Sequence, residues 1–414
     1  MLPLIKILVV FTLIIVMLRK KAGMGATMMA STALLGLLFG MGALDLFKQV
    51  AVTLVTLSTV FLIAALVLIA VLESVMRGTG MLKTMTDSLS RLPWNPRIII
   101  SAIPAIIGFL PSAGGARFSA PLVDQAAAGT PYRAEDKVFI NYWFRHIWEY
   151  SLPLYPGLIL AAHFSGVALG TILLWQWPVT VIWAVLGYWV VFRRYKSNQN
   201  PRQQEGAINS GSGGVTGDQG TPENLLKSLA ASTWPLWATV MLVLAHLPIV
   251  WSLCLVLAGL IIQKRYPLAR VWQTVKDPLT VKIVFLTWGT MAFKDVLQVS
   301  GAVVQVSNSI VSAGVPTLLI LIALPLVVGV LTGLVQACIG VSFPLVMAMV
   351  EPSAGYVMLA YVSGVVGVMI SPVHLCLILT AEYFKADFMR SYRPVIVPSL
   401  MVVAGTLVLY SFRI

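Results

Sequence analysis

Charged residues are scarce in this sequence, in which only 10% of the residues are Asp, Glu, Lys or Arg. Hydrophobic residues make up 58%, and the mean hydropathy is +0.90. A soluble domain carries about 25% charged residues, so this composition excludes one and indicates an integral membrane protein. The net charge of +13 does not indicate nucleic-acid binding. The lysines and arginines fall between apolar segments and form no basic face with interleaved aromatic residues.

Cysteine is scarce as well. Cys254, Cys338 and Cys376 all lie in apolar segments, without CxxC or Cys/His metal-ligand spacing. We therefore interpret them as small hydrophobic residues and predict neither a metal site nor a cofactor. The catalytic patterns HExxH and GxSxG are also absent, so we expect no enzymatic activity and keep an intramembrane enzyme only as a remote alternative.

Apolar segments of about 20 residues, each long enough to cross a bilayer, alternate with short polar ones along the chain. This pattern predicts an all-α polytopic membrane protein with the lipid bilayer as its solvent. Between residues 197 and 222 the composition changes to Gly, Ser, Asn and Gln, which is typical of a flexible linker. We therefore divide the chain into a first half (1–196), a linker (197–227) and a second half (228–414).

Two apolar segments are interrupted by glycine, proline and polar residues at corresponding places in the two halves. They are GFLPSAGGARFSAPLV (108–123), within about 98–128, and LTGLVQACIGVSFPLV (331–346), within about 316–350. Each predicts a helical hairpin that re-enters the membrane from one side. Unpaired backbone at such a turn is tolerated only where protein or a water-filled cavity surrounds it. A pair of interrupted segments is therefore the best sequence pointer to a transporter's binding site.

Two longer apolar segments are interrupted by proline near their middle. The segment at about 137–164 contains Pro153 and Pro156, and the segment at about 356–384 contains Ser371 and Pro372. Each predicts one broken helix.

Sequence matches relate the two halves of the chain. SAPLV matches SFPLV at a spacing of 342 − 119 = 223, and PLYPGLILAAHF matches PVHLCLILTAEY at 372 − 153 = 219. We therefore expect two repeats, each with five crossings, one of them broken, and a hairpin. Since five is odd, the second repeat is inverted, an arrangement typical of alternating-access transporters.

The lysines and arginines outside the apolar segments lie almost entirely on one side of the expected topology. By the positive-inside rule, this distribution predicts a cytoplasmic linker with both termini outside.

The doubled order of three crossings, a PSAGGARFSAPLV hairpin, a broken helix and a final crossing resembles the ion transporter superfamily. That superfamily includes divalent anion/sodium symporters and citrate, gluconate and arsenite carriers. PSAGGARFSAPLV, RHIWEYSLPLYPG and SPVHLCLILTAEYFKAD also resemble a prokaryotic integral-membrane family without an assigned function. The resemblance implies an elevator-type secondary transporter in the inner membrane, a homodimer with a scaffold and a moving transport domain.

The sequence departs from that superfamily at the hairpin tips. Where the dicarboxylate carriers have Ser-Asn-Thr triplets, this chain has Pro111-Ser112-Ala113 and Thr332-Gly333-Leu334. Their sodium sites are therefore in doubt here, and we favour protons over sodium as the coupling ion.

The substrate site is predicted at the two hairpin tips. Gly114 and Gly115 open the second half of the first hairpin, where free helix N–H groups favour an anion. Arg117 follows on the first turn and is interpreted either as a carboxylate clamp or as a structural ion pair with Glu149. The predicted substrate-binding residues are Ser112, Gly114, Gly115, Arg117, Ser119, Thr332, Gly333, Gln336 and Ser342.

The coupling site is predicted at the breaks of the two broken helices. His146 and Glu149 share one helix face by their spacing of three and are candidate proton carriers. For Arg145, His146 and Glu149, the alternative to a coupling role is that all three face water at the interface. For His374, the alternative is a packed, hydrogen-bonded residue. The predicted coupling residues are His146, Glu149, Ser151, Ser371 and His374.

Together these features predict a carrier of a small organic anion, driven by H⁺ or Na⁺. A cation/proton antiporter on the same fold is the alternative.

Overall fold

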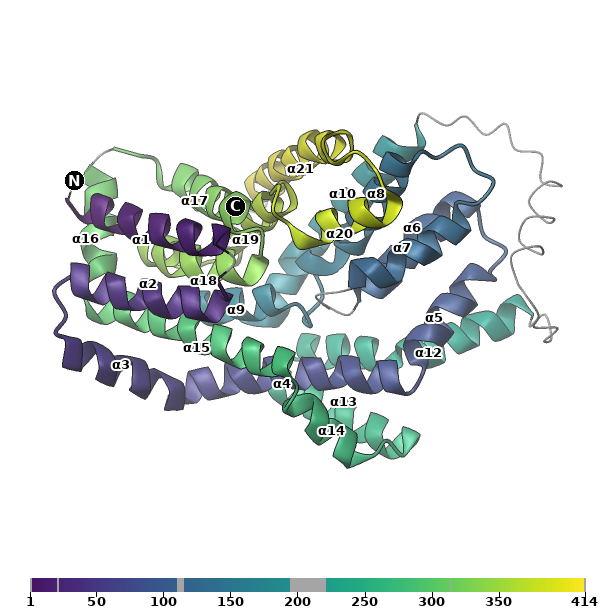
Figure 1. Cartoon of the computed structure of the whole chain (residues 1–414), viewed down its shortest axis with the longest axis horizontal. Helices are drawn as coiled ribbons and strands as arrows, with labels where there is room; N and C mark the ends of the chain where they lie inside the picture. Colours follow the sequence, from purple (N-terminus) through teal and green to yellow (C-terminus); the bar gives the residue numbers. More distant parts are fainter. Residues whose placement is uncertain (1, 21, 110–114, 194–220, 313, 413–414) are drawn as a thin grey trace.

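This computed structural model describes residues 2–20, 22–109, 115–193, 221–312 and 314–412. All regular secondary structure within these residues is helical. The prediction of an all-helical chain is thus confirmed for that part. Three described helices are long and apolar enough to cross a membrane: α4 (Leu57–Gly78), α10 (Leu169–Phe192) and α21 (Phe388–Ser411). Shorter apolar helices lie alongside them in an elongated molecule (Figure 1).

Each half begins with a group of helices that precedes its hairpin. In the first half these are α1 (Leu2–Arg19), α2 (Met24–Leu38), α3 (Ala43–Val55), α4 and α5 (Met81–Ser90). In the second half they are α12 (Pro222–Leu244), α13 (Ile249–Lys264), α14 (Leu268–Val275), α15 (Pro278–Val299) and α16 (Ala302–Ser312). The two groups interleave, because α15 packs along α2 and α4 packs against α13.

The two interrupted segments contain pairs of short helices. In the first segment, α6 (Pro96–Gly108) is followed by α7 (Gly115–Ala126); residues 110–114 lie outside the described part. In the second, α17 (Thr317–Thr332) ends at Gly333 and α18 (Val335–Val346) begins two residues later, followed by a short 3₁₀ helix, η2 (Met347–Met349). Gly333 has a φ of +61°, a left-handed conformation that suits glycine at a helix C-terminus.

The two proline-containing segments are interrupted near the predicted positions. The first consists of α8 (Ala134–Arg145), a 3₁₀ turn η1 (Ile147–Tyr150) and α9 (Pro156–Ser165). The second consists of α19 (Ala354–Met369) and α20 (Leu375–Phe384). Pro156 stands at the first turn of α9, where its missing N–H costs nothing. Both breaks are therefore confirmed.

Each broken helix packs against hairpins of both halves. In the first half α6 and α7 contact α8, and in the second α17 and α18 contact α19. Across the halves, α7 contacts α20 and α18 contacts α9. The packing brings residues more than 200 positions apart into one polar cluster.

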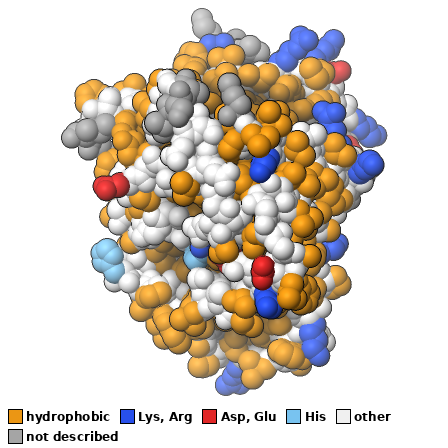
Figure 2. Space-filling model, turned by 90° about the vertical axis from the view of Figure 1, so that its left-hand side faces the viewer, with side chains coloured by type: hydrophobic (Ala, Val, Ile, Leu, Met, Phe, Trp, Pro, Cys, Tyr) orange, Lys and Arg blue, Asp and Glu red, His pale blue; other side chains and the backbone are white. Residues whose placement is uncertain are grey.

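Large apolar side chains remain exposed over much of the surface. Ile262, Phe47 and Leu268 are 77%, 72% and 70% exposed, and Figure 2 shows hydrophobic side chains over much of one face. On that face the lysines and arginines lie mostly toward one edge. Such a surface is unfavourable in water and suits an apolar solvent.

Candidate functional site

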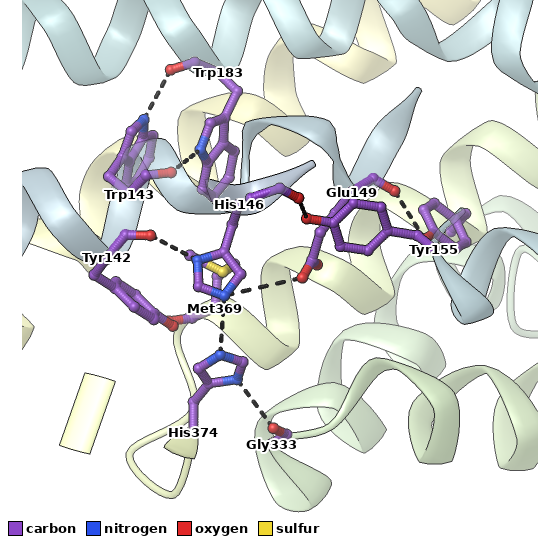
Figure 3. Close-up of polar contacts among 11 residues, drawn as sticks. Tyr142, Trp143, His146, Glu149, Tyr155, Trp183, Gly333, Met369 and His374 are labelled. Carbon is purple, nitrogen blue, oxygen red and sulfur yellow. Dashed lines mark hydrogen bonds and ion pairs between the residues drawn. The ribbon is translucent and has the colours of Figure 1, made fainter. Parts of the chain in front are cut away.

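The breaks of the two broken helices meet at a pair of histidines. His146 is the residue after α8, and His374 immediately precedes α20. Their Nε2 atoms lie 3.3 Å apart, and the two side chains point toward one another (Figure 3). Both residues are buried, at 4% and 7% exposure. The structure therefore brings together two residues that the sequence analysis assigned separately to the coupling site.

Backbone carbonyl groups fix the orientation of both rings. His146 Nδ1 lies 2.6 Å from the carbonyl oxygen of Tyr142, and His374 Nδ1 lies 3.0 Å from that of Gly333. A carbonyl oxygen can only accept a hydrogen bond, so each Nδ1 must carry the proton and donate it. In a neutral ring the remaining nitrogen, Nε2, then has a lone pair. The two histidines thus direct these lone pairs toward the same small space.

A carboxylate lies beside this pair. Glu149, on η1, places Oε1 3.9 Å from His146 Nε2 (Figure 3). Its other oxygen, Oε2, is buried and has no hydrogen-bond partner among the described residues. The alternative in which Arg145, His146 and Glu149 face water is wrong, because their side chains are packed inside the protein.

Cys376 completes the cluster. Its Sγ and one ring nitrogen from each of His146 and His374 all lie within 4.8 Å of one another. The sequence analysis, which interpreted this cysteine as a small hydrophobic residue, did not identify these polar neighbours. His374-Leu375-Cys376 at a predicted break was the local signal for a polar role, but His146, the partner of His374, lies 228 residues before His374 in the chain.

Two tyrosines connect the broken helices reciprocally. Tyr142, on α8, donates a 2.9 Å hydrogen bond to the carbonyl of Met369, and Tyr361, on α19, donates one of 2.9 Å to that of Glu149. The donors are 361 − 142 = 219 positions apart and the acceptors 369 − 149 = 220. These spacings agree with the 219-residue match between the broken helices.

Hairpin residues contact both breaks. The carbonyl of Gly333, at the tip of the second hairpin, is the partner of His374, and Ser371 Oγ donates a 2.6 Å bond to Val330. In the first half Tyr155 Oη donates a 2.6 Å bond to the carbonyl of Gly108, at the end of α6. Each break is thus fixed to the end of the first helix of a hairpin.

Arg145 lies against the start of α7. A Cβ atom added to Gly115 would overlap the guanidinium of Arg145, and one added to Gly108 would overlap its backbone carbonyl. The arginine is 4% exposed. A buried guanidinium and a helix N-terminus are both electropositive, so their meeting point favours an anion. The sequence analysis predicted this site at Gly115 and did not assign Arg145 to it.

The other predicted residues lie in different surroundings. Ser119 and Ser342 are buried on α7 and α18 and donate to carbonyls of their own helices. Thr332 Oγ1 contacts the carbonyls of Gly329 and Leu334, and Gln336 is half-buried. Ser151 Oγ forms a 2.8 Å hydrogen bond with Thr180 on α10. Ser112, Gly114 and the side chain of Arg117 lie outside the described part of the chain.

Comparison with known proteins gives one family. A family model described as "Protein of unknown function (DUF401)" matches residues 4–209 and 214–412, which is nearly the whole chain. No curated protein matches the sequence.

Proposed function

The chain belongs to the family of proteins of unknown function DUF401. For this member of the family we propose the function of a secondary active transporter of a small organic anion. The substrate is of the carboxylate class, and its movement is coupled to H⁺ or Na⁺. The transporter has two inverted repeats and works by an elevator-type motion of the hairpins and broken helices, as part of a homodimer in the cytoplasmic membrane.

The observation that carries this proposal is the convergence of interrupted helices from both halves. The reciprocal bonds of Tyr142 and Tyr361, at matched spacings of 219 and 220 residues, support two related repeats. Interrupted helices are costly at membrane depth and are kept where they line a binding site. A site shared equally by two repeats suits alternating access from either side.

The electrostatics at the first hairpin support an anionic substrate. The guanidinium of Arg145 contacts the backbone of Gly115, the first residue of α7. A planar guanidinium pairs well with a carboxylate, and helix N–H groups can bind the same anion. A charge that is buried in a membrane protein is by default functional. We therefore place the carboxylate of the substrate between Arg145 and the α7 terminus.

The second candidate function is cation/proton antiport, and it is favoured by the carboxylate and the two imidazoles of the same cluster. Glu149 and the two imidazoles offer an oxygen and two nitrogen atoms as cation ligands. The sequences of the hairpin tips are compatible with both anion transport and cation/proton antiport. Since they lack Asn-bearing triplets, we favour protons over sodium for both functions.

Transport by purified protein in proteoliposomes tests the proposal. We expect uptake of one or more members of a panel of radiolabelled carboxylates, accelerated by an imposed pH gradient at constant sodium. An Arg145→Gln variant that is correctly inserted should lose this uptake. Sodium or potassium flux driven by the pH gradient, with no carboxylate uptake, would instead identify the antiporter. If neither flux exceeds that of empty liposomes, the protein is not a transporter of either class.

A further inference from the structure

The cluster of His146, His374 and Cys376 contains more hydrogen-bond acceptor atoms than it has protons to donate to them. With both Nδ1 atoms donating to carbonyls, two Nε2 lone pairs face each other at 3.3 Å. The thiol of Cys376, within 4.8 Å of a ring nitrogen of each histidine, has a single proton and can donate to only one of them. The thiol proton therefore leaves the other lone pair without a donor from this cluster, and Oε2 of Glu149 has no hydrogen-bond partner among the described residues. A cation bound between these groups would satisfy them together.

We propose that His146, His374 and Cys376 form a binding site for a divalent transition-metal ion of the Zn²⁺ class, with Glu149 as a fourth ligand. The metal would be held at Nε2 of each histidine, at Sγ of the cysteine and at a carboxylate oxygen. The site lies where the two broken helices meet, and it joins residues of both halves of the chain. The proposal does not rest on the anion transport proposed above.

The separation of the two nitrogens fits tetrahedral coordination. Zn–N bonds of about 2.0–2.1 Å at a tetrahedral angle place two ligand nitrogens about 3.3–3.4 Å apart. The distance between the Nε2 atoms of His146 and His374 is 3.3 Å. Glu149 Oε1 lies 3.9 Å from His146 Nε2, so its side chain must move closer to complete the coordination. The histidines are therefore preorganised for two adjacent positions of a tetrahedron.

The outer contacts also suit metal ligation. Histidine ligands normally donate their second ring N–H to a carbonyl or carboxylate, which fixes the tautomer and aims the ligating nitrogen. Tyr142 and Gly333 supply those carbonyls here. Cys376 stands on the first turn of α20, where the helix dipole stabilises a negatively charged sulfur.

The donor atoms select the class of metal. Two imidazoles, a thiolate and one carboxylate are typical of Zn²⁺ and its neighbours in the first transition row. Na⁺, Mg²⁺ and Ca²⁺ prefer oxygen ligands, and among the four proposed ligands only Glu149 supplies oxygen. We therefore expect Zn²⁺ and Co²⁺ to bind and Mg²⁺ and Ca²⁺ not to compete.

Cobalt provides a direct spectroscopic test of the ligands. Purified full-length protein in detergent, with its affinity tag removed and metals chelated, is titrated with Co²⁺. We expect one equivalent to give the visible bands of tetrahedral cobalt and a sulfur-to-cobalt charge-transfer band in the near ultraviolet. Zn²⁺ added afterwards should abolish both, whereas Mg²⁺ should leave them unchanged. Octahedral cobalt without a sulfur band in the wild-type protein would overturn the proposal.

Variants identify the ligands one at a time. Cys376→Ser should remove the charge-transfer band, and His374→Gln should weaken Co²⁺ binding by at least the 10–100-fold that loss of an outer contact costs. Cys254→Ser is the matched control, because Cys254 is also half-buried in an apolar helix but lies outside the cluster. A sulfur band that survives Cys376→Ser would contradict the assignment.

X-ray absorption of the wild-type protein loaded with Zn²⁺ gives a second readout that needs no variant. One sulfur at about 2.3 Å and two or three nitrogen or oxygen ligands at about 2.0–2.1 Å are expected. Absence of sulfur from the first coordination sphere would overturn the site even if the variants failed to fold.

Discussion

Trp143 and Trp183 exchange hydrogen bonds with each other's backbone. The indole N–H of Trp143 donates a 2.8 Å bond to the carbonyl of Trp183, and that of Trp183 donates a 3.0 Å bond to the carbonyl of Trp143 (Figure 3). The two rings stack with centroids 3.9 Å apart, and both side chains are fully buried. This pair holds α8, which carries the candidate site, against α10.

Replacing Trp183 by Phe should weaken that attachment. The change keeps an aromatic ring but removes one donor, so we expect a loss of about 1–3 kcal/mol in the free energy of unfolding. Thermal melting in detergent would measure it. Trp251→Phe is the matched control, because Trp251 is 55% exposed and should tolerate the change. Equal melting temperatures for both variants would show that the hydrogen bond donated by the Trp183 indole contributes nothing.

Gly115→Ala should disturb Arg145 without removing its charge. The added methyl group would overlap the guanidinium, which is buried and must move. Overpacking of this kind costs about 1–3 kcal/mol, and we expect anion uptake to fall sharply. Gly259→Ala on α13 is the control, since its Cβ meets only Trp234, at 3.7 Å. That change should leave uptake intact and raise stability by up to about 1 kcal/mol. Normal uptake by Gly115→Ala would exclude an anion site at this contact.

The sequence predicted the interruptions of the helices because they have local causes. Pro156 can occupy the first turn of a helix but not its interior, and Gly333 permits the left-handed residue that ends α17. Both effects can be identified from a few neighbouring residues. The interruptions that fall within the described residues were therefore located correctly without knowledge of their packing.

The residues that make up the cluster could not be predicted from short stretches of the sequence. His146 and Cys376 come from different halves of the chain, and only packing brings them together. The repeat contained part of this information, because the 219-residue match aligns the break that contains His374 with the one that follows His146. Arg145 was missed for a similar reason, since its neighbour Gly115 belongs to another helix.

The orientation in the membrane can be tested at the linker. Because the lysines and arginines favour one side, we expect residues 197–222 to be cytoplasmic and both termini outside. Single cysteines placed in the linker of a variant lacking Cys254, Cys338 and Cys376 should resist an impermeant thiol reagent in whole cells. They should react once the membrane is made permeable. Ready labelling in intact cells would reverse the proposed orientation.

Arg117, on α7, can be assigned to the substrate or to Glu149 by a double-mutant cycle. If it binds the carboxylate of the substrate, Arg117→Lys keeps the charge but loses the bidentate geometry, and transport should fall sharply. Arg117→Ala should then nearly abolish substrate binding while the protein still folds. In this case Glu149→Gln should not restore binding, because the lost interaction is with the substrate.

A structural ion pair between Arg117 and Glu149 gives the opposite pattern. Arg117→Ala would leave the buried carboxylate of Glu149 without that partner and should cost about 3–5 kcal/mol of stability. Adding Glu149→Gln removes the charge as well and should recover much of the loss. Melting temperature and substrate affinity, measured on the four proteins of the cycle, separate the two hypotheses. Strong coupling in stability with intact affinity in the double variant would mean that Arg117 is not a substrate ligand, and the anion site would then rest on Arg145.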